Sequence, residues 1–152
     1  MAGGEMSFRR PLAAAATLAL VGCAVHPGGG FSATEVTIAD PRDAPVLALA
    51  ITELVAAKEG PGPDPIVLQP AGLDDPVARD LKTDLLSRGY QVTQGAGPAN
   101  RVLRYEIGPF GRSTLLRVSL NGGDAAKLFA RSKDGALVAI SPFTSRGPGE
   151  AL

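Results

Sequence analysis

The chain has few side chains that could do chemistry. Histidine, the usual general base, occurs once, at His26, and cysteine occurs once, at Cys23. His26 is followed by a Pro-Gly-Gly-Gly run with no candidate metal ligand or acid–base partner nearby. No Gly-x-Ser-x-Gly motif is present, and no histidine after residue 26 could activate a serine. We therefore expect no catalytic residue, no metal and no cofactor, and so no enzyme.

The acidic pairs and glycine loops have structural explanations. Asp40 with Asp43, and Asp74 with Asp75, stand at the predicted starts of helices, where an Asp side chain accepts hydrogen bonds from free backbone N–H groups. A phosphate-binding loop needs a strand, a glycine loop and a helix in immediate succession. The Gly95-Ala96-Gly97 loop is followed by Pro98 and a predicted strand instead. We expect no small-molecule substrate.

The lone cysteine has the context of an acylation site. Two arginines, Arg9 and Arg10, precede an apolar run over residues 12–20, which is too short for a permanent membrane span and typical of a signal peptide. The start at Met1 and a start at Met6 both remain open. The following Leu20-Val21-Gly22-Cys23 resembles the lipobox of bacterial lipoproteins. That resemblance implies cleavage after residue 22 and lipidation of Cys23.

Composition and charge bound the remaining possibilities. The 152 residues include 15 basic and 15 acidic side chains, and this balance argues against a nucleic-acid partner, which needs a basic face. A single cysteine excludes a disulfide framework. We divide the chain into a signal peptide (1–22), a lipidated Cys23 with a flexible Gly-rich tether (23–40), one domain (41–145) and a flexible tail (146–152).

Hydrophobic periodicity predicts the elements of the domain. Helical spacing appears after Asp43-Ala44-Pro45 and again after Asp75-Pro76, where Asp can cap and Pro suits the first turn. The expected apolar positions of these helices are Leu47, Ile51, Leu54 and Val55, and then Val77, Ala78, Leu81, Leu85 and Leu86. Short strands are expected at 66–69 and 90–93.

From residue 101 the apolar period becomes two. Leu103, Tyr105 and Ile107 alternate with polar residues, as do Leu116, Val118 and Leu120, and Ala126, Leu128 and Ala130 form the expected apolar set of a third strand. A last apolar run covers 137–140, and Ser141 onward is expected to fray. Short turns make these strands an antiparallel meander. The fold class is α+β, a small sandwich with two helices on one face of a mainly antiparallel sheet.

A few residues of this meander are candidates for contact with a partner. Arginines recur along it, at 101, 104, 112, 117 and 131, and the alternative to a binding strip is the solvated face of a half-buried sheet. Core packing explains Phe110 and Phe143 least, and exposed aromatic residues favour interfaces. We select Arg104, Phe110, Arg117 and Phe143 as possible partner contacts.

Several short segments follow one another in the order seen in a known family. They are Ile66-Val67-Leu68-Gln69, a Leu-x-x-x-Gly-Tyr-x-Val pattern ending at Val92, Leu103-Arg104-Tyr105, residues 116–120, Asp134-Gly135 and the stretch from Phe143 to Arg146. Over residues 44–146 and in its signal segment, the chain resembles the TrbH family of conjugal transfer lipoproteins. Leu116 and Phe143 stand where that family often has an aromatic residue and a Trp.

The resemblance implies a component of a conjugative type IV secretion (mating-pair formation) apparatus. Its partners would be other subunits of that machine, to which a sheet edge could offer a strand, and the membrane, through the lipid on Cys23. Ala24 after the cysteine resembles lipoproteins at the periplasmic face of the outer membrane. The alternative is a pilotin-like or other envelope lipoprotein outside conjugation.

Overall fold

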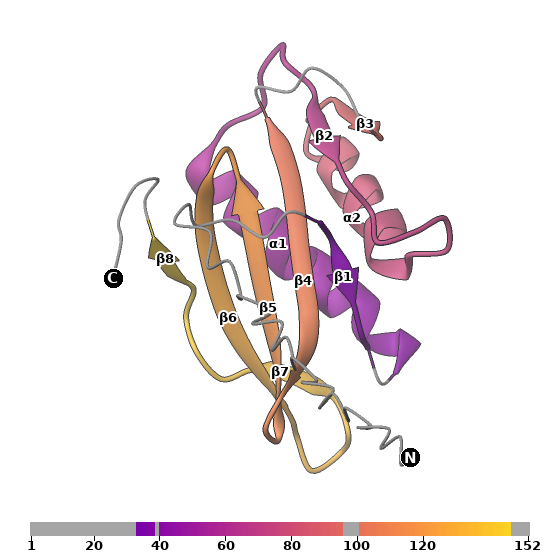
Figure 1. The fold of residues 1–152 in the computed structure, drawn as a ribbon, viewed down its shortest axis with the longest axis vertical. Helices are drawn as coiled ribbons and strands as arrows, with labels where there is room; N and C mark the ends of the chain where they lie inside the picture. The colour runs from indigo at the N-terminus through magenta and orange to yellow at the C-terminus, as the bar shows by residue number, and fades with distance from the viewer. Residues whose placement is uncertain (1–32, 39, 96–100, 147–152) are drawn as a thin grey trace, which may run out of the picture.

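The computed structural model describes residues 33–38, 40–95 and 101–146. In this part of the chain, two helices lie on one face of an open, mixed sheet of eight strands (Figure 1). The helices are α1 (Ala44–Lys58) and α2 (Pro76–Ser87), with a 3₁₀ turn, η1 (Pro41–Asp43), before α1. The strands are β1 (Glu35–Val36), β2 (Ile66–Leu68), β3 (Val92–Gln94), β4 (Val102–Phe110), β5 (Ser113–Leu120), β6 (Gly123–Arg131), β7 (Leu137–Ala139) and β8 (Thr144–Arg146). The predicted α+β class is confirmed.

The sheet has a parallel part and an antiparallel part. The main path of strands is β3-β2-β4-β5-β6-β7. The first three strands of the chain pair in parallel, β2 with both β3 and β4, and β1 with β4. From β4 onward the pairs are antiparallel, as the short predicted turns require.

Two strands lie where the sequence predicted none. Strand β1 falls inside residues 23–40, which we assigned to the tether, and it pairs Glu35 and Val36 with the second half of β4. Strand β8 lies beyond Ser141, where fraying was expected, and pairs with β6 through Thr144–Arg146. Both strands are short, and neither segment carries an apolar run like those at 66–69 and 137–140, so the hydrophobic pattern did not reveal them.

The two helices begin differently. At α2 the prediction holds, because the Asp75 side chain accepts hydrogen bonds from the N–H groups of Val77 and Ala78. At α1 the predicted cap is wrong, since Asp43 makes no capping hydrogen bond. Instead Asp40 accepts from the Arg42 N–H and caps η1, while Asp43 is occupied by an ion pair described below.

The core lies between the helices and the sheet. The predicted apolar residues of α1, β4 and β5 are buried there, and so are Val77, Ala78, Leu81 and Leu85 of α2. Two expectations fail. Leu86 is 49% exposed, and β6 buries Ala125 and Phe129 rather than the predicted Ala126, Leu128 and Ala130. The register explains the second failure, because Val118 of the buried set faces Ala125 across the β5–β6 ladder.

Candidate functional site

The predicted lipidation site, Cys23, and the lipobox residues Leu20, Val21 and Gly22 lie outside the described residues. The structure therefore bears only on the domain that would follow the anchor. No helix in the described part of the chain is long and apolar enough to cross a membrane. Nor do the described residues contain a group of three or more His, Cys, Asp or Glu side chains that could hold a metal ion.

Helices α1 and α2 both lie on one face of the sheet, and we call the opposite face the open face. In Figure 1, α1 lies behind β4, β5 and β6 and α2 lies behind β2, so the open face is turned toward the viewer. On β4 it carries Arg104, Glu106 and Phe110, whose positions alternate with the buried residues of that strand. The predicted contacts Arg104, Phe110 and Arg117 therefore share one face.

The half of the open face nearer the start of β4 is polar. Arg104 lies opposite Ser119 in the β4–β5 ladder, and Glu106 lies opposite Arg117. Arg117 Nη1 is 2.8 Å from Glu106 Oε2, and Arg104 Nε donates to Gln69 Oε1 at 2.6 Å. Because the Arg117–Glu106 pair is about two-fifths exposed on both sides, we expect it to contribute little to stability.

A shallow hollow of about 290 Å³ adjoins this polar half. It is lined by Arg117, residues 124–126 and the three residues of β8. One carboxylate oxygen, Asp124 Oδ1, is buried with no hydrogen-bond partner among the described residues. Such groups are usually paired in folded proteins, and this oxygen is an exception among the described residues.

The other half of the open face is apolar. Leu115 lies opposite Leu128 on β6, and the Ile140 N–H donates to the Leu128 carbonyl, which places Ile140 beside Leu128. Val138 lies opposite Ala130. Phe110, at the end of β4, is 59% exposed, and Val138 and Ile140 are 43% and 55% exposed. We call Phe110, Leu115, Leu128, Val138 and Ile140 the apolar strip.

Val138 and Ile140 are exposed but were not predicted as contacts. The sequence showed residues 137–140 only as a last apolar run. An uninterrupted apolar run in the final strand of a meander was the available signal, because such a strand can form the sheet edge and expose part of itself.

Comparison with known families matches residues 25–146 of the chain to the family described as conjugal transfer protein TrbH. The chain belongs to the TrbH family. No curated protein and no solved structure matched it. The family assignment made from the sequence is thus confirmed, and this TrbH-family protein has a conjugal transfer function.

Phe143 occupies a different position from the other predicted contacts of this TrbH-family protein. It is partly buried and packs against the core. The Lys127 ammonium lies 4.8 Å from the centre of its ring, within the range of a cation–π interaction. Lys127 shares its side of β6 with the buried Phe129, so Phe143 and Lys127 together close the core at this edge. Packing therefore accounts for Phe143.

Two of the five arginines proposed as a strip are structural. Arg101 donates to Glu59 Oε2 at 2.8 Å and to the Asp64 carbonyl at 2.9 Å. It thereby ties the Pro-rich connector after α1 to the start of β4. Arg131 pairs with Asp43 from the helix side of the sheet. Of the five arginines, Arg104 on β4 and Arg117 on β5 lie on the open face. Arg104 donates to Gln69 there, and Arg117 pairs with Glu106.

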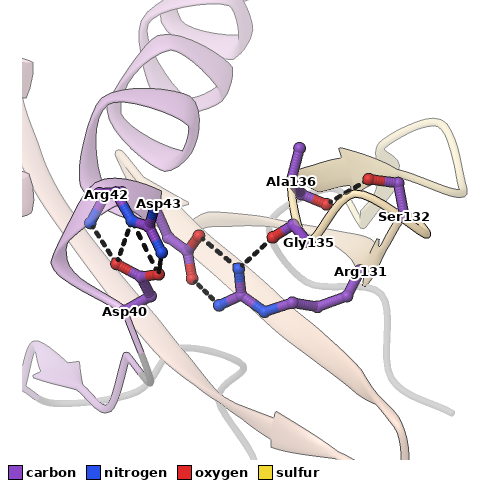
Figure 2. A network of polar contacts seen from close by, with 7 residues as sticks. All are labelled: Asp40, Arg42, Asp43, Arg131, Ser132, Gly135 and Ala136. Atoms are coloured by element: carbon purple, nitrogen blue, oxygen red, sulfur yellow. Dashed lines mark hydrogen bonds and ion pairs between the residues drawn. The ribbon is translucent and has the colours of Figure 1, made fainter.

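Figure 2 shows how the Arg131 pair fixes the β6–β7 turn. Both guanidinium Nη atoms of Arg131 donate to the buried Asp43 carboxylate, and Nη1 also donates to the Gly135 carbonyl at 2.8 Å. Nearby, hydrogen bonds from Arg42 lower the pKa of Asp40 to about 2. The start of α1 and the turn before β7 are thus joined, which holds the edge strand in place.

Proposed function

We propose that this TrbH-family protein is a lipid-anchored structural component of a conjugative type IV secretion apparatus, and that it acts by binding other subunits rather than by catalysis. The family match over residues 25–146 carries the proposal. No nucleic acid or small-molecule ligand is required by this role.

The anchor in this proposal is Cys23. The Leu20-Val21-Gly22-Cys23 sequence supports it, and Ala24 favours the periplasmic face of the outer membrane. Several acyl chains together give stable membrane attachment. A tether then keeps the domain at a high effective concentration near membrane-bound partners.

The open face is the binding surface in this proposal. It brings exposed apolar side chains beside charged residues of both signs, a combination found where an interface has an apolar centre and a polar rim. These features fit recognition of a protein surface.

The test is a mating assay with a gene deletion. We expect deletion to reduce conjugative DNA transfer and the wild-type gene to restore it. The Cys23→Ser form, which should fail to incorporate labelled palmitate, should restore transfer poorly, and Cys23→Ser with an appended lipoprotein signal segment from the same envelope serves as its control. Transfer at the wild-type rate in the deletion strain would refute the proposal.

A further inference from the structure

The two edges of the sheet differ in how they are protected. The β3 edge has the sequence Val92-Thr93-Gln94, in which both polar residues are exposed. The β7 edge continues from Leu137–Ala139 into Ile140, with no charged residue and no proline. Natural sheets usually protect an edge with charges, proline or a bulge, because an unprotected edge accepts another strand. The β7 edge has none of these within residues 137–140.

The backbone of β7 has hydrogen-bonding groups directed away from the sheet. The Ile140 N–H donates to the Leu128 carbonyl, and the Ser132 N–H donates to the Ala136 carbonyl, so the even-numbered residues bond to β6. In an antiparallel ladder the alternate residues point the other way. Leu137 and Ala139 therefore direct N–H and C=O groups outward, and no described residue pairs with them.

The side chains next to this edge are apolar and accessible. Val138 and Ile140 point to the open face and continue the apolar strip through Leu128 and Leu115 toward β4. A strand added along β7 would place alternate side chains directly beside Val138 and Ile140. The outward backbone groups and the apolar side chains thus both favour an extended apolar segment at this edge.

The charge of Lys133, at one end of the edge, further limits which segment can bind there. Lys133, in the turn that precedes β7, is exposed and has no ion-pair partner among the described residues. Its neighbour Asp134 accepts a hydrogen bond from the Ser132 hydroxyl, which lowers the Asp134 pKa. An acidic group on a partner gains at the Leu137 end of the edge by direct contact with the Lys133 ammonium, because the ionised Asp134 beside it offsets the lysine charge at longer range.

We propose that the β7 edge binds an extended apolar segment of another subunit of the transfer apparatus by strand addition, with a carboxylate of that segment near Lys133. This inference rests on the proposed function. A lipid surface fits less well, because it cannot satisfy the outward N–H and C=O groups of Leu137 and Ala139.

The edge is formed before any partner arrives. Arg131 holds the Gly135 carbonyl, and the Ser141 hydroxyl accepts from the Leu128 N–H at 2.9 Å, so both ends of β7 are fixed to β6. A preorganised edge loses little conformational freedom on binding. Strand addition therefore needs no rearrangement of the domain.

The test uses the full-length protein in mating cells, with the photo-cross-linking residue p-benzoylphenylalanine at position 140. Ala139→Pro removes one outward N–H while leaving the bonds to β6 in place. Its matched control is Gln94→Pro on the β3 edge, where the Gly95 N–H bonds to β2 and Gln94 faces outward. A second pair is Lys133→Glu against Arg88→Glu, both at exposed cations.

We expect the position 140 probe to form an adduct with one other subunit, mapped by mass spectrometry to an apolar segment bearing an acidic residue. Ala139→Pro should lower both the adduct yield and DNA transfer about tenfold, as expected from the loss of edge hydrogen bonds and close fit. Lys133→Glu should lower the yield less, and both controls should leave it unchanged.

Three outcomes would overturn the strand-addition proposal. They are an adduct unaffected by Ala139→Pro, an adduct of two copies of this chain, and an absence of any protein adduct in cells that transfer DNA normally. None of these affects the proposed function, which fails only if the deletion strain transfers DNA at the wild-type rate. Accumulation of each variant at the wild-type level excludes misfolding as the cause of a loss.

Discussion

The same strands form both faces of the sheet, the face that the helices cover and the open face. The side chains on the two faces differ in their roles. On the covered face Leu103, Tyr105 and Ile107 are buried, and the polar groups present there are paired. On the open face the intervening positions of β4 carry Arg104, Glu106 and Phe110, which remain accessible to differing degrees. The difference indicates that one face stabilises the fold and the other is available for binding.

The largest effects on stability should come from the covered face. Leu81→Ala and Leu116→Ala each remove a fully buried side chain, and each should lower the free energy of unfolding by about 2–5 kcal/mol. Denaturant unfolding of the purified domain measures this. Leu86→Ala, at a half-exposed position of α2, is the control and should cost much less. Equal losses at Leu81 and Leu86 would contradict the assignment of the two helix faces.

A smaller loss is expected when the link between α1 and the β7 turn is broken. Arg131→Ala leaves the buried Asp43 carboxylate without its partner, which should cost about 1–3 kcal/mol because Arg131 is itself partly exposed. Arg42→Ala breaks the exposed pair with Asp40 and serves as the matched control, and its effect should be smaller than that of Arg131→Ala because water screens this pair. Thermal melting of both variants would show whether the two pairs differ in this way.

Tyr105 should link stability to alkaline pH. Its hydroxyl donates to Asp75 Oδ2 at 2.5 Å, and burial, with this hydrogen bond, raises the Tyr105 pKa above its ordinary value. The folded state thus holds the proton after an unfolded tyrosine has lost it, so this contribution to stability is full below about pH 10 and falls as the pH rises further.

Tyr105→Phe tests this link. We expect a loss of about 1–2 kcal/mol at pH 8, where the Asp75 carboxylate loses one hydrogen bond, and a weaker decline of stability between pH 10 and 11 than in the wild type. Tyr90→Phe is the control, since the Tyr90 hydroxyl donates to the Glu59 carbonyl rather than to a carboxylate. An identical alkaline decline in Tyr105→Phe and wild type would show that Tyr105 is not the group responsible.

Local sequence rules predicted the covered face well and the contacts that connect distant segments poorly. Asp75 precedes Pro76 and caps α2 as expected, because a cap depends only on adjacent residues. Asp43, followed by Ala44 and Pro45, also precedes a helix but pairs with Arg131, which lies 88 residues away in the sequence. A partner at that distance leaves no local signal.

The candidate site shows the same limit. Arg104, Phe110 and Arg117 were selected for their residue types, and their common face follows from the period of two. The rest of the apolar strip was missed, in part because β6 carries Ala125 and Phe129 on one side and Ala126, Leu128 and Ala130 on the other. Both sets are apolar enough to be buried, so the pattern alone does not identify the core side, and only pairing with β5 decides it.

The central claim is that the open face acts in DNA transfer while the covered face holds the fold. The most direct measurement is the transfer frequency of a deletion strain carrying Arg104→Glu with Arg117→Glu, compared with Arg104→Lys with Arg117→Lys. We predict that the Glu pair accumulates and melts close to the wild type yet transfers DNA at least about tenfold less often, and that the Lys pair transfers normally. Wild-type transfer by a stably folded Glu pair would contradict the claim.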